Sequence, residues 1–489
     1  MRCLCNDFLL LRQGSARYPK WAAVLLGSGV ALGHAPLSLW LISIACLILF
    51  FGLSSDAVSP MKLGWSFGFG YFLVTLNWIV EPFLVDLQTT GFMAPFALIL
   101  MAGGLALFWG AAGLFTRGFG PLGWVLGLTL AEYLRGVLFT GFPWGLLSYT
   151  LTESPFVGFF AWLGPHGVTL FLLLISALSA QRFFAAAAGV STIMLTCALI
   201  PLPEMQRDLA ETTVRLVQPN APQEQKWDPF YAPIFLDRMI DATAADPKVD
   251  VIIWPESAIY TALNYADRHL ERLRSAAGRA DVIFGILRID ERDRLYNSLV
   301  LSRDDQPPQI YDKRHLVPFG EYLPFEDWLL RNGFAFAPEL FGVGFSAGRS
   351  ATPMILSNSV KILPMICYEL IFPRAVSAAR QDADVIVQIS NDAWFGGFSG
   401  PAQHLEITRV RAIEQGMPIV RVSNPGVSAV IDGRGNVVDQ MPLNTAGHLD
   451  VQVPLIHYKT PYAWFGNWAF WVIWMALLAL AMRQSRIKD

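Results

Sequence analysis

The stretch VKILPMICYEL, residues 360–370, decides the fold class of the C-terminal half of this chain, because it is an apolar, strand-like run that ends in a cysteine and a glutamate. Five more runs of this kind alternate with charged, helix-like sequence between residues 249 and 424: VDVIIWPES, ADVIFGILRI, LYNSLVLS, ADVIVQIS and MPIVRVSN. Strands that are buried on both faces and covered by helices have this composition. The sequence therefore predicts a layered α/β fold for this block.

The sequence on either side of this block is much more apolar. The 489-residue chain is 54% hydrophobic and 15% charged, and charged residues are scarcest near its two ends. Runs of roughly 17 to 24 apolar residues suit helices that cross a hydrocarbon core about 30 Å thick. Eight such runs, the first of them short, predict eight transmembrane helices: Trp21–Gly33, Leu37–Leu53, Leu63–Val80, Phe92–Phe115, Leu122–Phe139, Val157–Ala180, Phe183–Leu202 and Ala463–Met482.

These runs predict three domains: seven transmembrane helices in residues 1–202, an α/β domain in residues 203–462, and a last helix with a tail in residues 463–489. Lysine and arginine resist translocation, so they mark cytoplasmic connections. They gather before the first helix, in alternate connections and after the last helix, with Arg135 as the exception. We therefore expect both termini in the cytoplasm and the α/β domain outside, in the periplasm if the cell is Gram-negative.

The sequence does not support nucleic-acid binding, phosphate binding by a glycine loop, or metal binding. A net charge of −3 gives no general attraction to nucleic acid. The sequence contains neither a phosphate-binding glycine loop nor a metal-binding Cys/His spacing, and DGRG at residues 432–435 predicts only a hairpin turn. We expect no nucleic-acid partner, no metal and no organic cofactor.

Cys367 is the lone cysteine of the predicted outer domain. In an oxidising compartment such a thiol has no intramolecular disulfide partner, so it is either buried and inert or used in chemistry. A nucleophilic cysteine needs a base and donors for the oxyanion. Glu256 ends a strand-like run, as Cys367 does, and Lys313 lies in YDKRHLVPFGEYLP. Because polar residues at strand ends converge on one sheet edge, the three together indicate a catalytic site.

These three residues, in WPES, YDKRHLVPFGE and CYE, resemble the Glu-Lys-Cys triad of the nitrilase superfamily. QPNAPQEQKWDP, VPFGEYLP, SNDAWFG and SNPG extend the match. With seven helices before the domain and one after it, nearly the whole chain is similar to the apolipoprotein N-acyltransferase family, the membrane-embedded branch of that superfamily. The resemblance implies an α/β nitrilase-like αββα sandwich beside a multi-pass α-helical membrane domain.

The resemblance also implies a two-step, ping-pong acyl transfer. Glu256 would deprotonate Cys367, whose thiolate would take an acyl chain from a phospholipid, expected to be phosphatidylethanolamine. The α-amino group of the S-diacylglyceryl cysteine of an apolipoprotein would then attack the thioester. Lys313 and the backbone N–H of Tyr368 would stabilise the oxyanion in both steps. We expect a monomer in the bacterial inner membrane.

Three residues near the triad have supporting roles by the same resemblance. Glu321, eight positions after Lys313, would orient that lysine and share its proton traffic. Tyr368 and Glu369 directly follow the nucleophile and match positions needed for activity. Because neighbouring residues point to different sides of a strand or turn, at least one of the two is expected to support the loop without doing chemistry.

Substrate contacts are also expected. Trp227 in QKWDP matches a tryptophan implicated in substrate handling, and Asn297 in LYNS is expected to accept or donate a hydrogen bond near the triad. Trp144 in GFPWGLLSY would line a lateral entrance. For both tryptophans a packing or interfacial role is the alternative. The aromatic segment 323–348 is expected to form an arm that touches the membrane or acyl chains, with core packing as its alternative.

Two other functions remain open from the sequence. A membrane-tethered amidohydrolase of the nitrilase type would use the same triad, with water in place of the amine. A transporter with a sensor domain is suggested by helix count alone. The whole-chain resemblance and the eight predicted helices favour acyl transfer.

Overall fold

The computed structural model describes residues 19–55, 57–205, 209–304, 306–332, 344–350, 352–379 and 382–488. The chain divides into two compact units. The helical unit comprises the chain up to residue 202, residues 398–406 and the chain from residue 460 onward. The sheet unit comprises residues 203–397 and 407–459. Helix α15 (Ser399–Gln415) therefore begins in the helical unit and ends in the sheet unit, which the sequence does not indicate.

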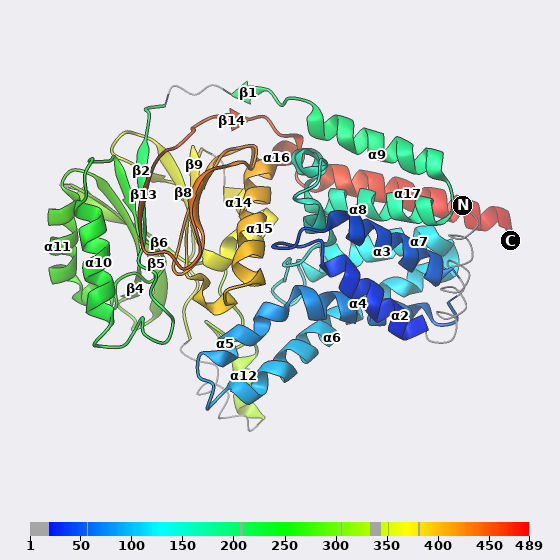
Figure 1. Ribbon diagram of the computed structural model, residues 1–489, viewed down its shortest axis with the longest axis horizontal. Coiled ribbons are helices and arrows are strands. Elements are labelled where there is room, and N and C mark those ends of the chain that lie inside the picture. The colour runs from blue at the N-terminus through cyan, green and yellow to red at the C-terminus, as the bar shows by residue number, and fades with distance from the viewer. Residues whose placement is uncertain are drawn as a thin grey trace. The chain divides into compact units, whose positions relative to one another are not determined.

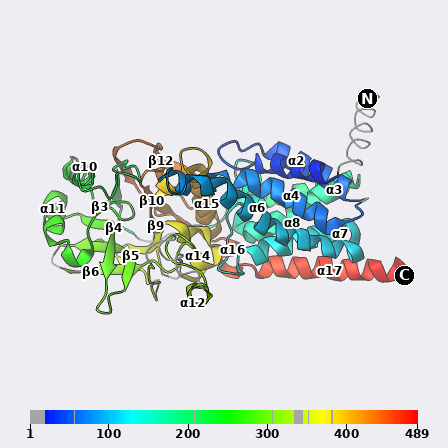
Figure 2. The same ribbon diagram turned by 90° about the horizontal axis from the view of Figure 1, so that it is seen from below.

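Every one of the eight apolar runs contains a helix (Figure 1). Helix α17 (Trp468–Lys488) lies along α7 (Thr116–Arg135), as Figure 2 shows. Its Trp474 Nε1 donates a 3.1 Å hydrogen bond to the carbonyl of Leu126. The helices of this unit are α2 (Pro19–Ala31), α3 (Trp40–Ser54), α4 (Pro60–Thr75), α5 (Glu81–Leu84), α6 (Ala94–Ala112), α7 (Thr116–Arg135), α8 (Phe160–Ala180), α9 (Phe184–Leu199), α16 (Pro461–Phe465) and α17 (Trp468–Lys488).

Three helical stretches in the described part of the chain are long and apolar enough to cross a membrane: Gly91–Arg135, Val157–Ala180 and Trp468–Arg486. The bent pair Pro60–Thr75 and Asn77–Leu84 would make a fourth. Other helices fall short: α9 has 16 residues and extends about 24 Å, against a hydrocarbon core of about 30 Å. The prediction of eight membrane spans is therefore not confirmed.

The stretch Gly91–Arg135 contains the fourth predicted run and most of the fifth, which fold back on each other near Gly120. Gly120 has φ 56° and ψ −138° and precedes Pro121, so the helix is interrupted there. Trp109 Nε1 donates a 2.9 Å hydrogen bond to Glu132 Oε1. An unbroken helix would separate these two residues by about 35 Å. The stretch is therefore a pair of antiparallel helices.

The sheet unit contains two six-stranded sheets within its described residues, with the orders β13-β2-β3-β4-β5-β6 and β12-β11-β10-β9-β8-β7. All six strand-like runs of the sequence contain a strand. The strands of the first sheet are β2 (Thr213–Gln218), β3 (Val251–Ile253), β4 (Asp281–Ile289), β5 (Leu295–Arg303), β6 (Gln306–Asp312) and β13 (Gly447–Gln452). Those of the second are β7 (Met354–Ile355), β8 (Lys361–Ile366), β9 (Val385–Ser390), β10 (Ile419–Ser423), β11 (Ser428–Ile431) and β12 (Val437–Met441).

Each sheet is mixed. Strands β2, β3 and β4 are parallel in the first sheet, as are β8, β9 and β10 in the second, and the outer pairs are antiparallel. The predicted turn at residues 432–435 joins β11 to β12 as an antiparallel hairpin. A separate two-stranded ladder pairs β1 (Glu204–Met205) with β14 (His457–Tyr458).

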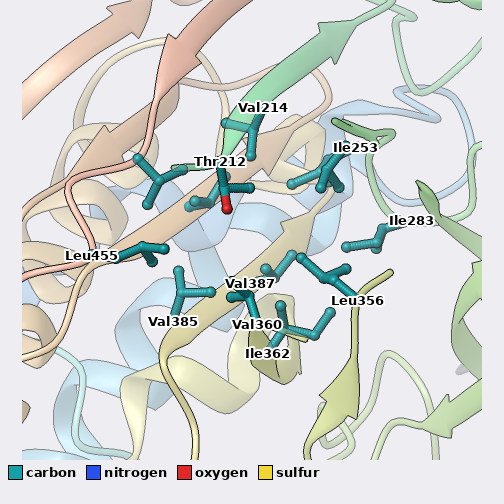
Figure 3. A pocket seen from close by; sticks show the side chains of 13 residues that line it. Thr212, Val214, Ile253, Ile283, Leu356, Val360, Ile362, Val385, Val387 and Leu455 are labelled. Carbon is teal, nitrogen blue, oxygen red and sulfur yellow. The ribbon is translucent and has the colours of Figure 1, made fainter. Parts of the chain in front are cut away.

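The layers follow the order helix, sheet, sheet, helix. Helices α10 (Ala232–Ala244) and α11 (Asp267–Ala277) cover the first sheet, whereas α14 (Pro373–Ala379) and the second half of α15 cover the second (Figure 1). The inner faces meet through valine, isoleucine and leucine side chains from both sheets (Figure 3). The αββα sandwich implied by the sequence is therefore observed.

A buried arginine fixes α10 to the first sheet. Arg215 on β2 donates two 2.7 Å hydrogen bonds to Asp450 on the neighbouring strand β13. It also donates to the carbonyls of Ala245 and Pro247, each at 2.7 Å, just beyond the end of α10. A cation at a helix C-terminus satisfies carbonyls that have no intrahelical donor.

We expect Arg215→Met to destabilise the sheet unit by about 3 kcal/mol, because it removes one partner of a buried ion pair. The melting temperature of the detergent-solubilised chain, measured by scanning fluorimetry, should fall by roughly 5 to 10 °C. Arg272→Met is the control, since Arg272 pairs with Asp237 at the surface with both side chains about half exposed. Equal decreases in melting temperature for the two variants would contradict the role of Arg215 in fixing α10 to the first sheet.

Candidate active site

Cys367 lies at the junction of strand β8 and the short 3-10 turn Cys367–Ile371. Its φ is +51°, a conformation that non-glycine residues rarely adopt and that costs about 1–3 kcal/mol. Gln388 on the neighbouring strand β9 donates a 3.0 Å hydrogen bond from Nε2 to the carbonyl of Cys367. This bond helps to hold the strained backbone of Cys367 in place.

Glu369 ties the turn after Cys367 to the segment that carries the predicted lysine. Its Oε1 accepts hydrogen bonds from the Tyr311 hydroxyl at 2.8 Å and the Arg314 N–H at 2.7 Å. Its Oε2 accepts from the Ile366 N–H at 2.8 Å. Burial raises the pKa of the Glu369 carboxyl, and these hydrogen bonds oppose that rise. The carboxylate is thus committed to holding two backbone segments together.

Glu256 follows strand β3 in a turn that lies against strand β4. The N–H of Gly285 on β4 donates a 3.1 Å hydrogen bond to the carbonyl of Pro255, and its own carbonyl accepts a 2.8 Å bond from the N–H of Ala258. A Cβ at position 285 would lie 2.6 Å from Cα of Glu256 and 2.5 Å from N of Ser257. Only glycine permits this approach, which fixes the position of the Glu256 backbone.

Four predicted residues meet in one buried polar cluster. Lys313 Nζ lies 2.8 Å from Glu321 Oε1 and 3.4 Å from Glu256 Oε1. Asn297 Nδ2 donates to the same two carboxylate atoms, at 2.6 Å to Glu256 and 3.2 Å to Glu321. The other oxygen of Glu321 accepts from the Val317 N–H at 2.8 Å. Two carboxylates thus share one ammonium and one amide donor.

The charges of this cluster act on the Cys367 thiol. Burial and the Glu256 carboxylate are the main causes that raise the pKa of Cys367 to about 12. Asp392 adds to the rise, whereas Lys313 and a hydrogen bond with Ser390 oppose it. Near neutral pH the sulfur is therefore a neutral thiol. A base must take its proton when it attacks a substrate.

Lys313 remains charged under the same conditions. Burial lowers its pKa, but Glu321 and Glu256 raise it by more, so the pKa lies well above the usual value for lysine. A permanent ammonium next to a carboxylate and a buried thiol can stabilise the negative charge of an oxyanion. The arrangement can therefore support nucleophilic attack on a carbonyl.

The motifs of the sequence did not predict a second polar network, which lies next to Cys367. Ser390 Oγ donates a 2.7 Å hydrogen bond to Asp392 Oδ1. Arg421, which is fully buried on strand β10, donates to Asp392 Oδ2 and, at 2.7 Å, to Gln388 Oε1. The sequence held a signal, since SNDAWFG contains two of these residues and an arginine interrupts the apolar strand run MPIVRVSN.

The remaining predicted residues have diverse surroundings. Tyr368 is buried with its ring edge-on to Phe372, and burial raises the pKa of its hydroxyl. Trp227 is 42% exposed. Trp144 is fully buried in the helical unit, where its indole N–H donates a 2.7 Å hydrogen bond to Gln403 on α15. These contacts give Trp144 a packing role, and its place at an entrance stays a prediction.

Arg135 holds the loop that contains Trp144. It forms a buried ion pair with Glu132 at 2.9 Å and donates to the carbonyls of Phe142, Trp144 and Gly145 at 2.6–3.0 Å. Because both charges are paired and hydrogen-bonded, their burial among apolar helices is tolerated.

The predicted arm at residues 323–348 lies partly outside the described residues, which exclude 333–343. Its described part includes helix α12 (Glu326–Arg331). Phe325 and Trp328 are 74% and 59% exposed. Contact of this segment with lipid stays a prediction.

Comparison with known proteins identifies the family. A profile described as the apolipoprotein N-acyltransferase N-terminal domain matches residues 26–178, and one described as carbon-nitrogen hydrolase matches residues 213–459. The apolipoprotein N-acyltransferase of Caulobacter vibrioides is 36% identical over 92% of this chain and 91% of its own length. That of Brucella melitensis is 34% identical over 86% and 84%. The chain therefore belongs to the apolipoprotein N-acyltransferase family.

This family member is an acyltransferase, and its carbon-nitrogen hydrolase region contains all the clustered residues described above. Among solved structures, an amidase of the nitrilase superfamily from Nesterenkonia is similar to 56% of this chain and 99% of its own length, with 18% sequence identity and a TM-score of 0.41.

We expect Gly285→Ala to lower acyl transfer by about 10- to 100-fold, because the added methyl group displaces the Glu256 backbone and a shift near 1 Å is enough for such a loss. Turnover and melting temperature should be measured together. Gly397→Ala is the control, since a Cβ there would meet no atom within 4 Å. Wild-type turnover in Gly285→Ala would contradict the proposed constraint on Glu256.

Proposed function

We propose that this enzyme transfers an acyl chain from a phospholipid to the α-amino group of the N-terminal S-diacylglyceryl cysteine of an apolipoprotein, through a thioester on Cys367. The similarity to apolipoprotein N-acyltransferases over 92% of the chain is the main support. The second support is the geometry of the site, where Glu256 and Lys313 are in contact and both act electrostatically on Cys367.

In the first step, the proton of the Cys367 thiol moves to Glu256 while the sulfur attacks the ester carbonyl of the phospholipid. The ammonium of Lys313 and the N–H of Tyr368 stabilise the oxyanion. The ester C–O bond then breaks. The leaving oxygen takes the proton from Glu256, which releases a lysophospholipid and leaves a neutral thioester.

In the second step, the neutral α-amino group of the acceptor attacks the thioester. Glu256 takes a proton from the attacking nitrogen, the C–S bond breaks, and this proton returns to the sulfur. Asn297 Oδ1 is buried and has no hydrogen-bond partner among the described residues, whereas its Nδ2 is fixed by two carboxylates. We infer that this oxygen accepts an N–H of the incoming amine.

The other predicted residues support these steps. Glu321 orients Lys313 through their 2.8 Å contact. Glu369 holds the backbone of the site and does no chemistry, which leaves Tyr368 as the neighbour that contributes its N–H. Trp227, half-exposed before α10, contacts the substrate. The proposal requires no metal or organic cofactor.

We propose that the helices of the eight apolar runs cross the inner membrane of a bacterium, with both termini in the cytoplasm and the catalytic domain in the periplasm. Removing an acyl chain from lipid costs about 0.8 kcal/mol per CH₂, so a site close to the outer leaflet avoids a large penalty. A C-terminal tag accessible only from the periplasm would contradict this orientation.

Phosphatidylethanolamine is the proposed acyl donor, and the monomer is the proposed oligomeric state. Faster acylation of the enzyme by phosphatidylglycerol would contradict the proposed donor. A dimer in a sedimentation experiment would contradict the proposed monomer.

We expect wild-type protein incubated with phosphatidylethanolamine to gain the mass of one acyl chain, and Cys367→Ala to gain none, because the sulfur is the attacking atom. Intact-protein mass spectrometry measures both. Cys197→Ala, which removes a cysteine from helix α9, should be acylated like the wild type. Acylation of Cys367→Ala would exclude the proposed nucleophile.

We expect the acyl-enzyme to pass its chain to a diacylated lipopeptide, and Glu256→Gln to block both half-reactions, with a loss of at least about 100-fold. Chromatography of the lipopeptide and of free fatty acid measures the outcome. Free fatty acid without N-acylated peptide would support an amidohydrolase. If the function of the protein in cells were unchanged in Cys367→Ala, that result would support a transporter.

A further inference from the structure

Lys226 is a buried cation in the segment between β2 and α10, directly before Trp227. Trp227 is 42% exposed, whereas Lys226 is only 7% exposed. The Lys226 ammonium donates a 2.9 Å hydrogen bond to the backbone carbonyl of Glu256, the proposed base. It also lies 5.7 Å from the ring centre of Trp227. The segment thus directs its lysine toward the site.

Burial of this ammonium needs compensation from the site. A buried charge costs several kcal/mol unless it is paired. Burial lowers the pKa of Lys226 to about 8, while the negative charges of Glu256 and of the Cys367 thiolate raise it. By reciprocity, a protonated Lys226 favours the thiolate form of Cys367. The protonation of Lys226 is therefore coupled to the ionisation of the Cys367 thiol.

The charges around Cys367 explain why a second cation is useful. Glu256 and Asp392 raise the pKa of the thiol, whereas the ammonium group of Lys313 lowers it. Lys313, however, is shared between Glu256 and Glu321. During the attack the thiol proton passes to Glu256, so the negative charge moves from that carboxylate to the sulfur and then to the oxyanion. One shared ammonium leaves the site with excess negative charge.

We propose that Lys226 is a positioning residue for the acyl transfer: its ammonium anchors the backbone of Glu256 and supplies the second positive charge that stabilises the Cys367 thiolate and the oxyanion. This inference rests on the proposed thioester mechanism. Lys226 neither donates nor accepts the transferred proton, which passes from sulfur to Glu256. Its contribution is electrostatic and depends on its remaining protonated.

The test uses Lys226→Met and Lys226→Arg in the full-length protein and measures the rate at which iodoacetamide alkylates Cys367, followed on the Cys367 peptide by mass spectrometry. Methionine keeps the volume and removes the charge, whereas arginine keeps the charge. At pH 7 we expect a decrease of about tenfold for Lys226→Met, equivalent to one pKa unit, and near wild-type alkylation for Lys226→Arg. Lys248→Met, at an exposed lysine, is the control and should match the wild type.

The pH profile separates charge from shape. Between pH 7 and 9 neither the thiol, with its pKa of about 12, nor Lys313, with a pKa well above the usual value, changes charge appreciably. Lys226 loses its proton in that window. The rise of the wild-type alkylation rate with pH should therefore flatten near pH 8, and in Lys226→Arg it should continue. Glu256, Asp392 and the Ser390 hydroxyl face the thiol in all variants.

If Lys226→Met were alkylated as fast as the wild type from pH 7 to pH 9, the inference would be overturned. Equal slowing of both variants with an unchanged profile would also overturn it, since that result indicates packing alone. Acyl-enzyme formation is measured in parallel with phosphatidylethanolamine. If the wild type forms no thioester but its alkylation depends on Lys226 as expected, the electrostatic role stands and the proposed function fails. If the wild type forms the thioester but its alkylation does not depend on Lys226, the proposed function stands and the electrostatic role fails.

Discussion

One buried ammonium group organises this active site. Lys313 lies between the carboxylates of Glu256 and Glu321, and Asn297 donates to the same two oxygen atoms. Two buried carboxylates in such proximity would repel each other without a shared cation. With the cation between them, the proposed base and the proposed oxyanion donor are held together, and burial and the Glu256 charge keep the Cys367 thiol neutral.

Backbone geometry makes this cluster possible. The four polar residues come from segments up to 65 positions apart, and the first sheet brings them to one region. Gly285 lets strand β4 touch the Glu256 turn, and Glu369 binds the Cys367 turn to the segment after β6. Cys367 itself has an unfavourable backbone conformation. Such strain is retained where the surroundings enforce it, as they do here through Gln388 and Glu369.

The same triad is suited to hydrolysis and to transfer, so the chemistry of the cluster does not by itself select the acceptor. Similarity across both the helical and the hydrolase-like regions is what separates this chain from a soluble amidase. In the helical unit, Glu132 and Arg135 bind each other and fix the loop around Trp144. Apolar helices can hold such a pair because each of the two charges finds a partner.

The sequence alone located most of the elements and predicted the triad. Alternation of β-branched and charged runs located three neighbouring strands of each sheet, because a strand buried on two faces must be apolar. The buried strand β2 was not predicted. The sequence placed Glu256 and Cys367 at strand ends, whereas only the structure shows that Lys313 directly follows strand β6. Glu321 and Asn297 also join the cluster as expected.

Tertiary structure decided what depends on side-chain direction and helix length. Lys226 and Trp227 are neighbours in sequence, and only the folded segment shows that the lysine is the buried one. Arg421 and Asp392 meet because their strands belong to one sheet, a long-range pairing that local patterns do not encode. The apolar runs located eight helices, but their lengths were set by glycine and proline breaks such as Gly120. Hydropathy measures how apolar a run is, whereas the backbone conformation fixes where each helix ends.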